Sequence, residues 1–302
     1  MRSIRLRMLA ATLRPIMRMR MQRVQDAAKV RAMMERASKL LFRAPPFALF
    51  GETTYLSDEA RQALWVSAGP VRSDKVILYL HGGGYLAGSP WVYRKLVAHL
   101  SAATGMRAFV PQYRLAPEHP VPICLDDAIA AFGHLRQMGY RAEQIAIGGD
   151  SAGGGLTFAL LAHLCAAGTP PGVVFAWCPC LDLTYSGASI RENARADHLF
   201  PGDRVEDLSR MILGDCRADD PRVSPLFADY PDCPPVLLQV ADTEILRDDS
   251  VRMEEKLRRQ GSEVRLEIWQ GTPHVWHFLC GYLPEARDAV RNTADFIRKH
   301  LG

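Results

Sequence analysis

The chain has 302 residues, 48% of them hydrophobic and 23% charged, which is typical of a soluble globular protein with a large core. No apolar run is long enough to cross a membrane as a helix, and the N-terminus lacks the uninterrupted apolar stretch of a secretory signal. The net charge of +4 is unevenly distributed. Residues 1–43 hold 12 Lys and Arg against 2 Asp and Glu, leaving 25 basic and 31 acidic residues in the rest of the chain.

The seven cysteines are scattered along the chain and odd in number. None lies in a Cys-x-x-Cys pair, and Cys178 and Cys180 have no histidine close by in the sequence. We therefore predict free thiols in a reducing compartment rather than a disulfide framework or a metal site. The expected location is the cytoplasm.

Residues 1–43 have the pattern of two amphipathic helices broken near Pro15, with apolar positions such as Met34 and Leu41 among basic residues. We favour a lid that packs its apolar stripe over the mouth of a site elsewhere in the chain. Weak contact with a membrane surface is the alternative interpretation. Nucleic acid is not expected as a partner, because the segment has no interleaved aromatic residues and no known binding motif. Arg43–Gly51 is interpreted as a linker.

From Lys75 onward, predicted strands alternate with predicted helices. The expected strands are Val76–Leu80, Arg107–Pro111, Ile145–Gly148, Val173–Trp177, Pro235–Val240 and Val264–Trp269. The expected helices are Trp91–Ala102, Leu125–Met138, Leu156–Ala167, Asp249–Gln260 and Glu285–His300. This alternation predicts an α/β fold with a mostly parallel central sheet and helices on both faces.

The stretch between Cys180 and Pro235 interrupts the alternation. It has no strand pattern but contains a charged helical run, Arg204–Leu213. An insertion of this length in a strand–helix unit is usually functional. Together with residues 1–43 it would form a helical cap over the strand ends.

The stretch IAIGGDSAGGG, residues 145–155, runs from a strand through a Gly-rich turn into a helix. Within it, Gly149–Gly153 fits the G-x-S-x-G nucleophile elbow, with Ser151 at the tip of the turn. The N-terminus of the following helix favours developing negative charge at this position. Taken alone, the motif also fits an incidental serine in a tight turn.

An acyl-transferring serine needs a base, an acid that orients the base, and backbone N–H groups that bind an oxyanion. The sequence HGGGY, residues 81–85, follows the first buried strand and would supply such N–H groups. The acids Asp242 and Glu244 follow the strand ending at Val240, and His274 follows the strand ending at Trp269. The order serine, acid, histidine is that of an α/β-hydrolase.

These motifs in combination resemble the hormone-sensitive-lipase-like carboxylesterases, bacterial esterase family IV, which have the α/β-hydrolase fold. The resemblance extends from about Lys75 to the end of the chain and is weak over residues 1–50. Its motifs are HGGGY (81–85), YRLAPEHP (113–120), GDSAGG (149–154), DLT (182–184), ILRDDS (245–250) and PHVWH (273–277).

The resemblance implies a serine carboxylesterase that hydrolyses short- to medium-chain acyl esters through an acyl-enzyme, with no metal and no cofactor. It implies that Ser151 is the nucleophile and His274 the general base. Gly83, Gly84 and Ala152 would donate their N–H groups to the oxyanion.

The acid is where this sequence departs from the family pattern, which often has Asp in a D-P-L-R-D-E run. The aligned residue here is Glu244, whose longer side chain also reaches an imidazole, and Asp242 is the alternative. Gly155 stands where many relatives have Asn, so a contact made by that Asn is not expected here.

The resemblance also suggests supporting residues. His81 would brace the Gly-rich loop from behind, and Asp150 and Glu118 would hold loops by hydrogen bonds and charge. Tyr85 and Trp91 are candidate walls of the substrate pocket.

The domain division follows from the same resemblance. Residues 1–50 would form N-terminal cap helices, residues 51–180 and 226–302 the catalytic domain, and residues 181–225 a cap insertion. The edge strand Val264–Trp269 is a candidate for pairing in a homodimer, because an apolar edge strand needs cover.

Two other functions are compatible with parts of this sequence. Amide hydrolysis, as by an arylformamidase, would use the same three side chains. A ligand-binding receptor derived from an inactive hydrolase is disfavoured, because Ser151, His274 and an acid are all present.

Overall fold

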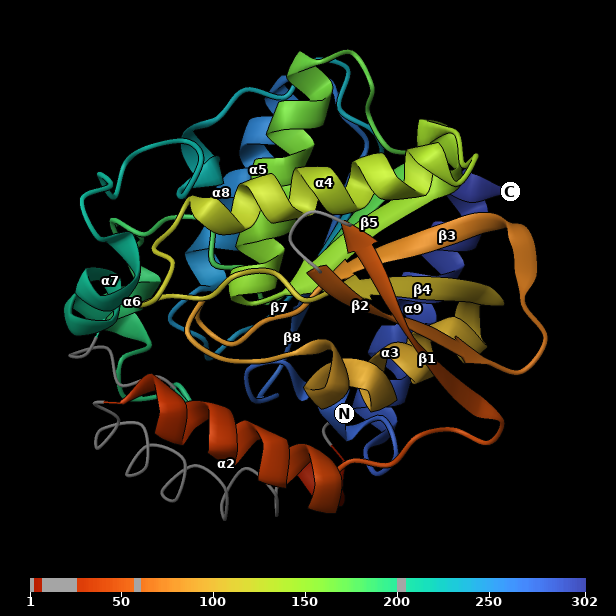
Figure 1. The fold of residues 1–302 in the computed structure, drawn as a ribbon. Helices are drawn as coiled ribbons and strands as arrows, with labels where there is room; N and C mark the ends of the chain where they lie inside the picture. The colour runs from red at the N-terminus through yellow and green to blue at the C-terminus, as the bar shows by residue number, and fades with distance from the viewer. Residues whose placement is uncertain (1–2, 7–25, 57–60, 200–204) are drawn as a thin grey trace.

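The computed structural model describes residues 3–6, 26–56, 61–199 and 205–302, which fold around an eight-stranded sheet (Figure 1). The strand order is β1-β2-β4-β3-β5-β6-β7-β8. The strands are β1 (Ala48–Leu56), β2 (Arg61–Ala68), β3 (Arg72–Leu80), β4 (Met106–Pro111), β5 (Ile145–Asp150), β6 (Val173–Trp177), β7 (Val236–Ala241) and β8 (Val264–Trp269). Strands β4, β3, β5, β6, β7 and β8 run parallel, so the predicted mostly parallel sheet is confirmed.

The central strands are buried along their whole length. Every residue of β5, β6 and β7 is buried, as are Val76–Leu80 of β3. Continuous burial is typical of parallel strands that are covered by helices on both faces, and it explains why these strands appear in the sequence as unbroken apolar runs.

The linker expected at Arg43–Gly51 is wrong in its second half, because β1 begins at Ala48. Strands β1 and β2 pair antiparallel with each other, and β2 pairs antiparallel with β4, which extends the sheet beyond the parallel strands. Strand β1 is half exposed and polar in its middle, since it forms the edge of the sheet. A strand of this kind lacks the apolar run by which the others were recognised.

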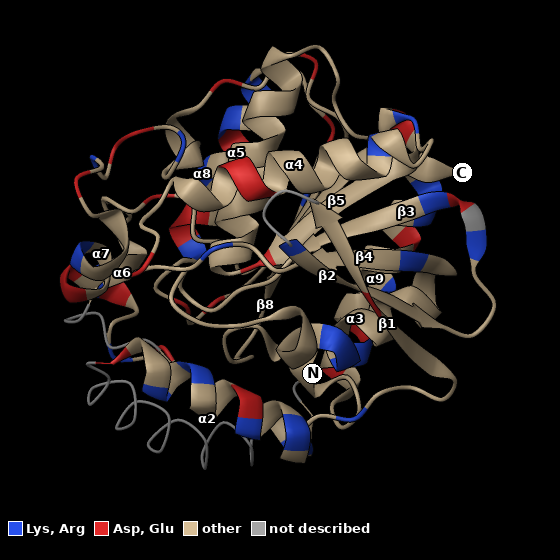
Figure 2. Ribbon diagram, viewed as in Figure 1, with Lys and Arg blue, Asp and Glu red and all other residues tan. Residues whose placement is uncertain are grey.

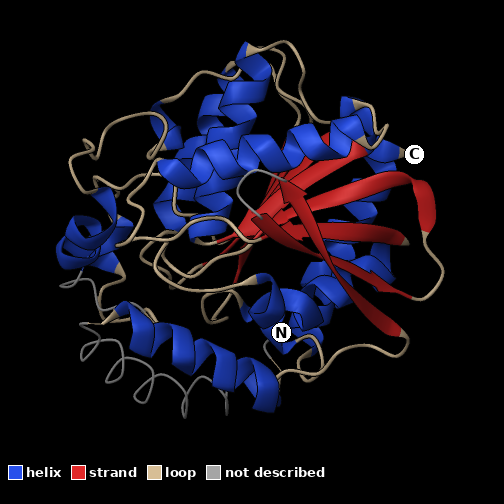
Figure 3. Ribbon diagram, viewed as in Figure 1, coloured by secondary structure: helices blue, strands red, loops and turns tan. Residues whose placement is uncertain are grey.

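Helices cover both faces of the sheet (Figure 3). Their bounds are α2 (Ala27–Leu40), α3 (Pro90–Thr104), α4 (Ile123–Gln137), α5 (Ala152–Ala166), α6 (Ser189–Glu192), α7 (Val205–Leu213), α8 (Arg247–Arg259) and α9 (Pro284–Leu301). Helices α4, α5 and α8 contribute to one cluster of buried side chains and α3 and α9 to the other. The five helices predicted for the body of the chain are confirmed.

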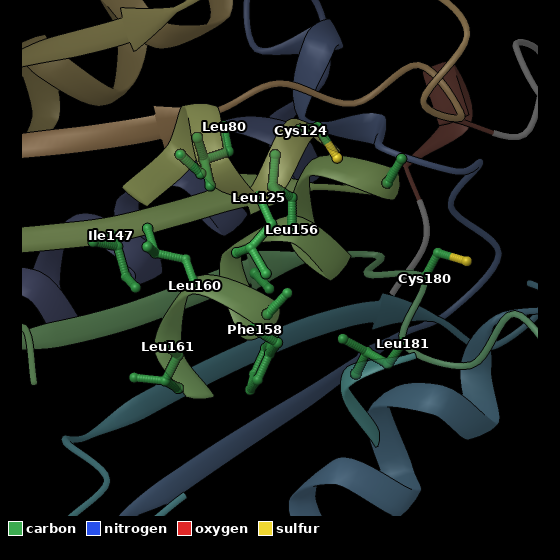
Figure 4. Packing of buried hydrophobic residues seen from close by; sticks show 14 of the residues in the cluster. Leu80, Cys124, Leu125, Ile147, Leu156, Phe158, Leu160, Leu161, Cys180 and Leu181 are labelled. Atoms are coloured by element: carbon green, nitrogen blue, oxygen red, sulfur yellow. The ribbon is translucent and has the colours of Figure 1, made fainter. Parts of the chain in front are cut away.

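Helix α5 is the most deeply buried helix next to the site, and its first ten residues are all buried. Figure 4 shows Leu156, Phe158 and Leu160 of this helix packed among Leu80 and Ile147 of the neighbouring strands. A helix that is apolar all round is expected in the core of a large domain. This packing holds the start of α5 in a fixed position against the sheet.

Helix α2 lies outside the two helical layers, beside α3 (Figure 1). Its N-cap residue is Asp26, whose side chain accepts a hydrogen bond of 2.9 Å from the N–H of Ala28. Figure 2 shows Lys and Arg positions, drawn in blue, along its length. The predicted break near Pro15 falls outside the described residues.

None of the helices in the described residues combines the length and apolar character needed to span a bilayer. Strand β8 forms the second edge of the sheet, and its Ile268 is 46% exposed. Pairing of this edge in a homodimer stays a prediction, as do the limits of the cap and the catalytic domain.

Candidate active site

Ser151 lies at the turn between β5 and α5 in an unusual backbone conformation, with φ 54° and ψ −123°. Positive φ is uncommon for a residue other than glycine, and such strain collects at functional sites. The turn is held by β6 and the chain after it: the Ser151 N–H donates to the carbonyl of Trp177 at 2.9 Å, and its carbonyl accepts from the N–H of Cys180 at 3.0 Å. The geometry of the serine is therefore fixed by its neighbours on both sides.

The glycines of the elbow are required by close backbone contacts. A Cβ at Gly149 would collide with the carbonyl oxygen of Leu80, and a Cβ at Gly153 would collide with the carbonyl oxygens of Leu80 and His81. Glycine at both positions lets the end of β3 lie directly against the serine turn.

His274 and Glu244 form a buried pair. The ring Nδ1 of His274 lies 2.8 Å from Oε2 of Glu244, and the two side chains are only 4% and 2% exposed. The other carboxylate oxygen of Glu244 accepts the N–H of Ala241 at 3.0 Å. Asp242, the alternative acid, accepts the N–H of Gly271 at 2.7 Å and so supports the loop before the histidine. Of the two acids, Glu244 is the one that contacts His274.

The environment of His274 favours its protonated form. Burial lowers the pKa of the imidazole, but the negative charge of Glu244 and its hydrogen bond to the ring raise it by more. The pKa of His274 therefore lies above its usual value of 6.5.

Ser151 and His274 line the same cavity, which has a volume of about 1170 Å³. Gly83, Gly84 and Ala152 line it as well. Within the described residues, the N–H groups of these last three donate no hydrogen bond to the protein. They are available to bind an oxygen atom of a ligand beside the serine.

Most walls of the cavity are apolar. Side chains that line it come from α2, from the stretch between β6 and β7, and from the chain that follows His274; they include Met33, Met34, Ala37, Leu183, Leu208, Ile212, Phe278 and Leu279. Helices α2 and α7 thus both contribute to the wall of the cavity that contains Ser151. The cap expected from the sequence was to be formed by residues 1–43 and by the insertion that contains α7.

His81 is fully buried, and its ring stacks on Tyr113 at a centroid distance of 4.3 Å. Its Nδ1 lies 2.9 Å from the carbonyl oxygen of Gly82. Burial lowers the pKa of His81 to about 4, so the ring is neutral near pH 7. Its bracing of the glycine-rich loop, residues 81–88, stays a prediction, and the contact with Gly82 is compatible with it.

Asp150, also fully buried, joins the serine turn to the glycine-rich loop. Its carboxylate accepts hydrogen bonds from the hydroxyls of Tyr79 (2.8 Å) and Tyr93 (3.0 Å) and from the N–H of Gly82 (3.0 Å). Burial raises the pKa of Asp150 to about 6, although these hydrogen bonds act in the opposite direction.

Arg31 of helix α2 bonds both to Glu118 and to the glycine-rich loop. The carboxylate of Glu118 accepts two hydrogen bonds from the guanidinium of Arg31, at 2.8 and 2.7 Å. The same guanidinium donates to the carbonyls of Leu86 (2.8 Å) and Ala116 (3.0 Å). Bidentate geometry of this kind is specific to arginine. The partner of Glu118 on α2 could not be identified from the sequence.

The two candidate pocket residues differ. Tyr85 is buried and lines the cavity. The expectation for Trp91 is wrong, because this residue is 42% exposed, lies outside the cavity lining, and donates its indole N–H to Glu52 of β1 at 2.9 Å. It is the second residue of α3 and faces the edge of the sheet.

Cys178 was predicted only as one of the free thiols, and the structure places it beside the acid and the base. Its sulfur lies within 4.8 Å of a carboxylate oxygen of Glu244 and a ring nitrogen of His274. His277 lies elsewhere: it is buried, stacks on Trp177 at 4.3 Å and has its Nε2 2.8 Å from Gln239. The position of Cys178 beside these two residues could not be predicted from a sequence pattern, because the three residues lie on separate loops.

Comparison with known proteins agrees with this geometry. A family model described as alpha/beta hydrolase fold matches residues 77–278. An acetyl-hydrolase of Streptomyces hygroscopicus is 37% identical over 245 residues, which cover 80% of both chains, and an esterase of Acinetobacter venetianus is 34% identical over 225 residues, 74% of both. Among solved structures, an esterase from the bacterial hormone-sensitive lipase family is similar over 100% of both chains, with a TM-score of 0.92 and 32% identity. The chain therefore belongs to the α/β-hydrolase family, among the esterases of the bacterial hormone-sensitive lipase type, and is a carboxylic ester hydrolase.

Proposed function

We propose that the protein is a serine carboxylesterase that hydrolyses short- to medium-chain acyl esters through an acyl-enzyme intermediate. The supporting observation is that Ser151, His274 and three backbone N–H groups with no partner among the described residues line one cavity, while Glu244 is hydrogen-bonded to Nδ1 of the histidine ring. This is the set of groups that acyl transfer requires.

In the first half of the reaction, Nε2 of His274 takes the proton of the Ser151 hydroxyl as its oxygen bonds to the ester carbonyl carbon. The N–H groups of the glycine-rich loop and of Ala152 stabilise the tetrahedral oxyanion. His274 then gives the proton to the alkoxy oxygen as the bond from carbon to that oxygen breaks, and the alcohol leaves. Glu244 holds the ring in the required tautomer and stabilises the imidazolium.

In the second half, water replaces the alcohol. His274 removes a proton from the water as its oxygen attacks the acyl carbon, and the second tetrahedral intermediate collapses. The carboxylic acid is released, and the proton returns to Ser151 through His274. Every proton that moves is carried by groups of the chain or by water.

The size and character of the cavity support medium acyl chains. Ligand pockets commonly enclose 300–1,000 Å³, and this cavity of about 1170 Å³ has mainly apolar walls. A cavity of this volume has room for both an alkyl chain and an alcohol group. Arg5, at its edge, is the only Lys or Arg among the described lining residues.

The activity is tested with p-nitrophenyl esters from acetyl to palmitoyl, measured beside a matched anilide. We expect kcat/KM to be highest among the short to medium chains and to fall for palmitoyl. Turnover of the anilide should be slower than that of the matched ester, and a preference for the anilide would replace the esterase proposal with an amidase. Binding of acyl ligands without turnover would indicate a receptor.

The pH dependence follows from the pKa of His274. The base must be neutral to accept the serine proton, so activity is present above the pKa of the free enzyme and is lost as the pH falls through it. Because the pair with Glu244 raises this pKa, the midpoint of the acid limb in kcat/KM should lie above 6.5. A profile that is flat from pH 5 to 8, measured with an uncharged ester, would contradict this assignment.

A further inference from the structure

The end of β6 and the turn after it lie against both the serine and the loop of the base. Trp177, the last residue of β6, and Cys180 hold the backbone of Ser151 by the two hydrogen bonds described above. Between them, the N–H of Cys178 donates to the carbonyl of Gln239 in β7 at 2.7 Å. The position of Cys178 is therefore fixed relative to the serine and to the strand that precedes Glu244.

The sulfur of Cys178 holds the loop of the base. It accepts the N–H of Val275 at 3.3 Å, and Val275 directly follows His274. Val275 has φ 47° and ψ 49°, a left-handed conformation that is a clear outlier for a β-branched residue. Cys178 has a positive φ of 50° as well. Strained residues persist only where their surroundings fix them, and this N–H to sulfur contact joins the two.

The same sulfur faces the acid. It lies within 4.8 Å of a carboxylate oxygen of Glu244 and a ring nitrogen of His274, and all three groups are buried or nearly so. Burial, and then the charge of Glu244, raise the pKa of the Cys178 thiol well above its usual value of 9.0. The group is consequently a neutral thiol near pH 7, with a proton to donate.

We propose that Cys178 is a positioning residue for the acid and the base. As an acceptor it fixes the backbone immediately after His274, and as an S–H donor it faces the carboxylate of Glu244. It acts through these two residues and does not touch the ester. The inference rests on the proposed function, because it assigns a role in the same serine hydrolysis.

The test compares Cys178→Ala and Cys178→Ser with the matched control Cys165→Ala. Cys165 is also a buried thiol, but it lies near the C-terminal end of α5, away from the cavity lining. The measurements are kcat, KM and the pH profile of kcat/KM with p-nitrophenyl butyrate, and the thermal midpoint of each variant.

For Cys178→Ala we expect kcat to fall roughly 10- to 100-fold with little change in KM, because a small displacement of the catalytic groups has effects of this size. The acid limb should move to higher pH, since loss of the S–H donor leaves the charge of Glu244 fully directed at His274. Cys178→Ser keeps a donor and an acceptor, but its Cβ–O bond is shorter than the Cβ–S bond of cysteine. Its kcat should therefore lie between those of Cys178→Ala and the wild type. Cys165→Ala should keep the wild-type kcat and acid limb.

Unchanged kcat and acid limb in Cys178→Ala would overturn the proposal, and so would an equal loss in Cys165→Ala. If the alanine variant does not fold, Cys178→Ser decides: a reduced kcat at unchanged KM supports the role, and wild-type kinetics reject it. Failure of the proposed function is distinguishable, because in that case the wild type itself would not hydrolyse the ester.

Discussion

Replacing Ser151 with alanine should reduce ester hydrolysis by at least about 10⁴-fold while leaving the fold intact. The side chain occupies the cavity beside His274 and makes no capping hydrogen bond to α5, so its loss removes the nucleophile without opening the core. The measurement is p-nitrophenyl butyrate turnover, with urea unfolding as the control for folding. Retained turnover at even a few per cent of wild type would contradict the assignment of the nucleophile.

Replacing Ser151 with glycine should abolish activity and also stabilise the protein. At φ 54° a side chain strains the backbone, which commonly costs 1–3 kcal/mol, whereas glycine adopts such a conformation freely but loses more conformational entropy on folding. The net gain in the free energy of unfolding should be about 1 kcal/mol relative to Ser151→Ala. If the glycine variant were less stable than the alanine variant, backbone strain at position 151 would not contribute significantly to the free energy of unfolding.

Replacing Glu244 with glutamine should lower kcat/KM by roughly 10³- to 10⁴-fold, the size of effect seen when an orienting carboxylate becomes an amide. The amide no longer stabilises the imidazolium, and its NH₂ group can favour the wrong tautomer of His274. Because the charge of Glu244 is what raises the pKa of the histidine, any residual activity should show an acid limb at lower pH than wild type.

The matched control is Asp242→Asn. Its side-chain oxygen still accepts the N–H of Gly271, so we expect a loss in kcat/KM of less than about tenfold. Both variants are measured on the same ester over the same pH range. A larger loss in Asp242→Asn than in Glu244→Gln would transfer the role of the acid to Asp242.

The site residues could be predicted from the sequence because each one has a suitable side chain and follows a predicted strand. Ser151, Glu244 and His274 each follow a strand of the parallel part of the sheet, and the carboxyl ends of parallel strands meet at one edge of a sheet. The expectation that they lie close together therefore needed only the strands and the turn motifs. Glu244 could be chosen over Asp242 by alignment to the family motif, and the structure adds the contact with His274 that an alignment cannot give.

Other features depend on tertiary packing that has no local signature. Strand β1 is an edge strand with an exposed face, so its sequence lacks an apolar run. Trp91 was a candidate pocket wall, but its position on α3 directs its indole N–H to Glu52 of β1, a contact that the sequence alone does not reveal. The hydrogen bond between Val275 and Cys178 joins residues 97 positions apart, and Glu244, close to the same sulfur, is 66 positions from Cys178. No periodicity in the sequence predicts that these residues lie together.

The wall that α2 contributes to the cavity has an evolutionary consequence. The family match begins at residue 77, whereas α2 ends at Leu40, so part of the wall of the proposed substrate cavity is encoded outside the region matched by the family model. The proposed catalytic residues lie within the matched region. Mutations in the first forty residues can therefore alter which esters fit without altering how they are cleaved. Duplicated copies of such a gene could diverge in their substrates while selection preserves the same reaction in each.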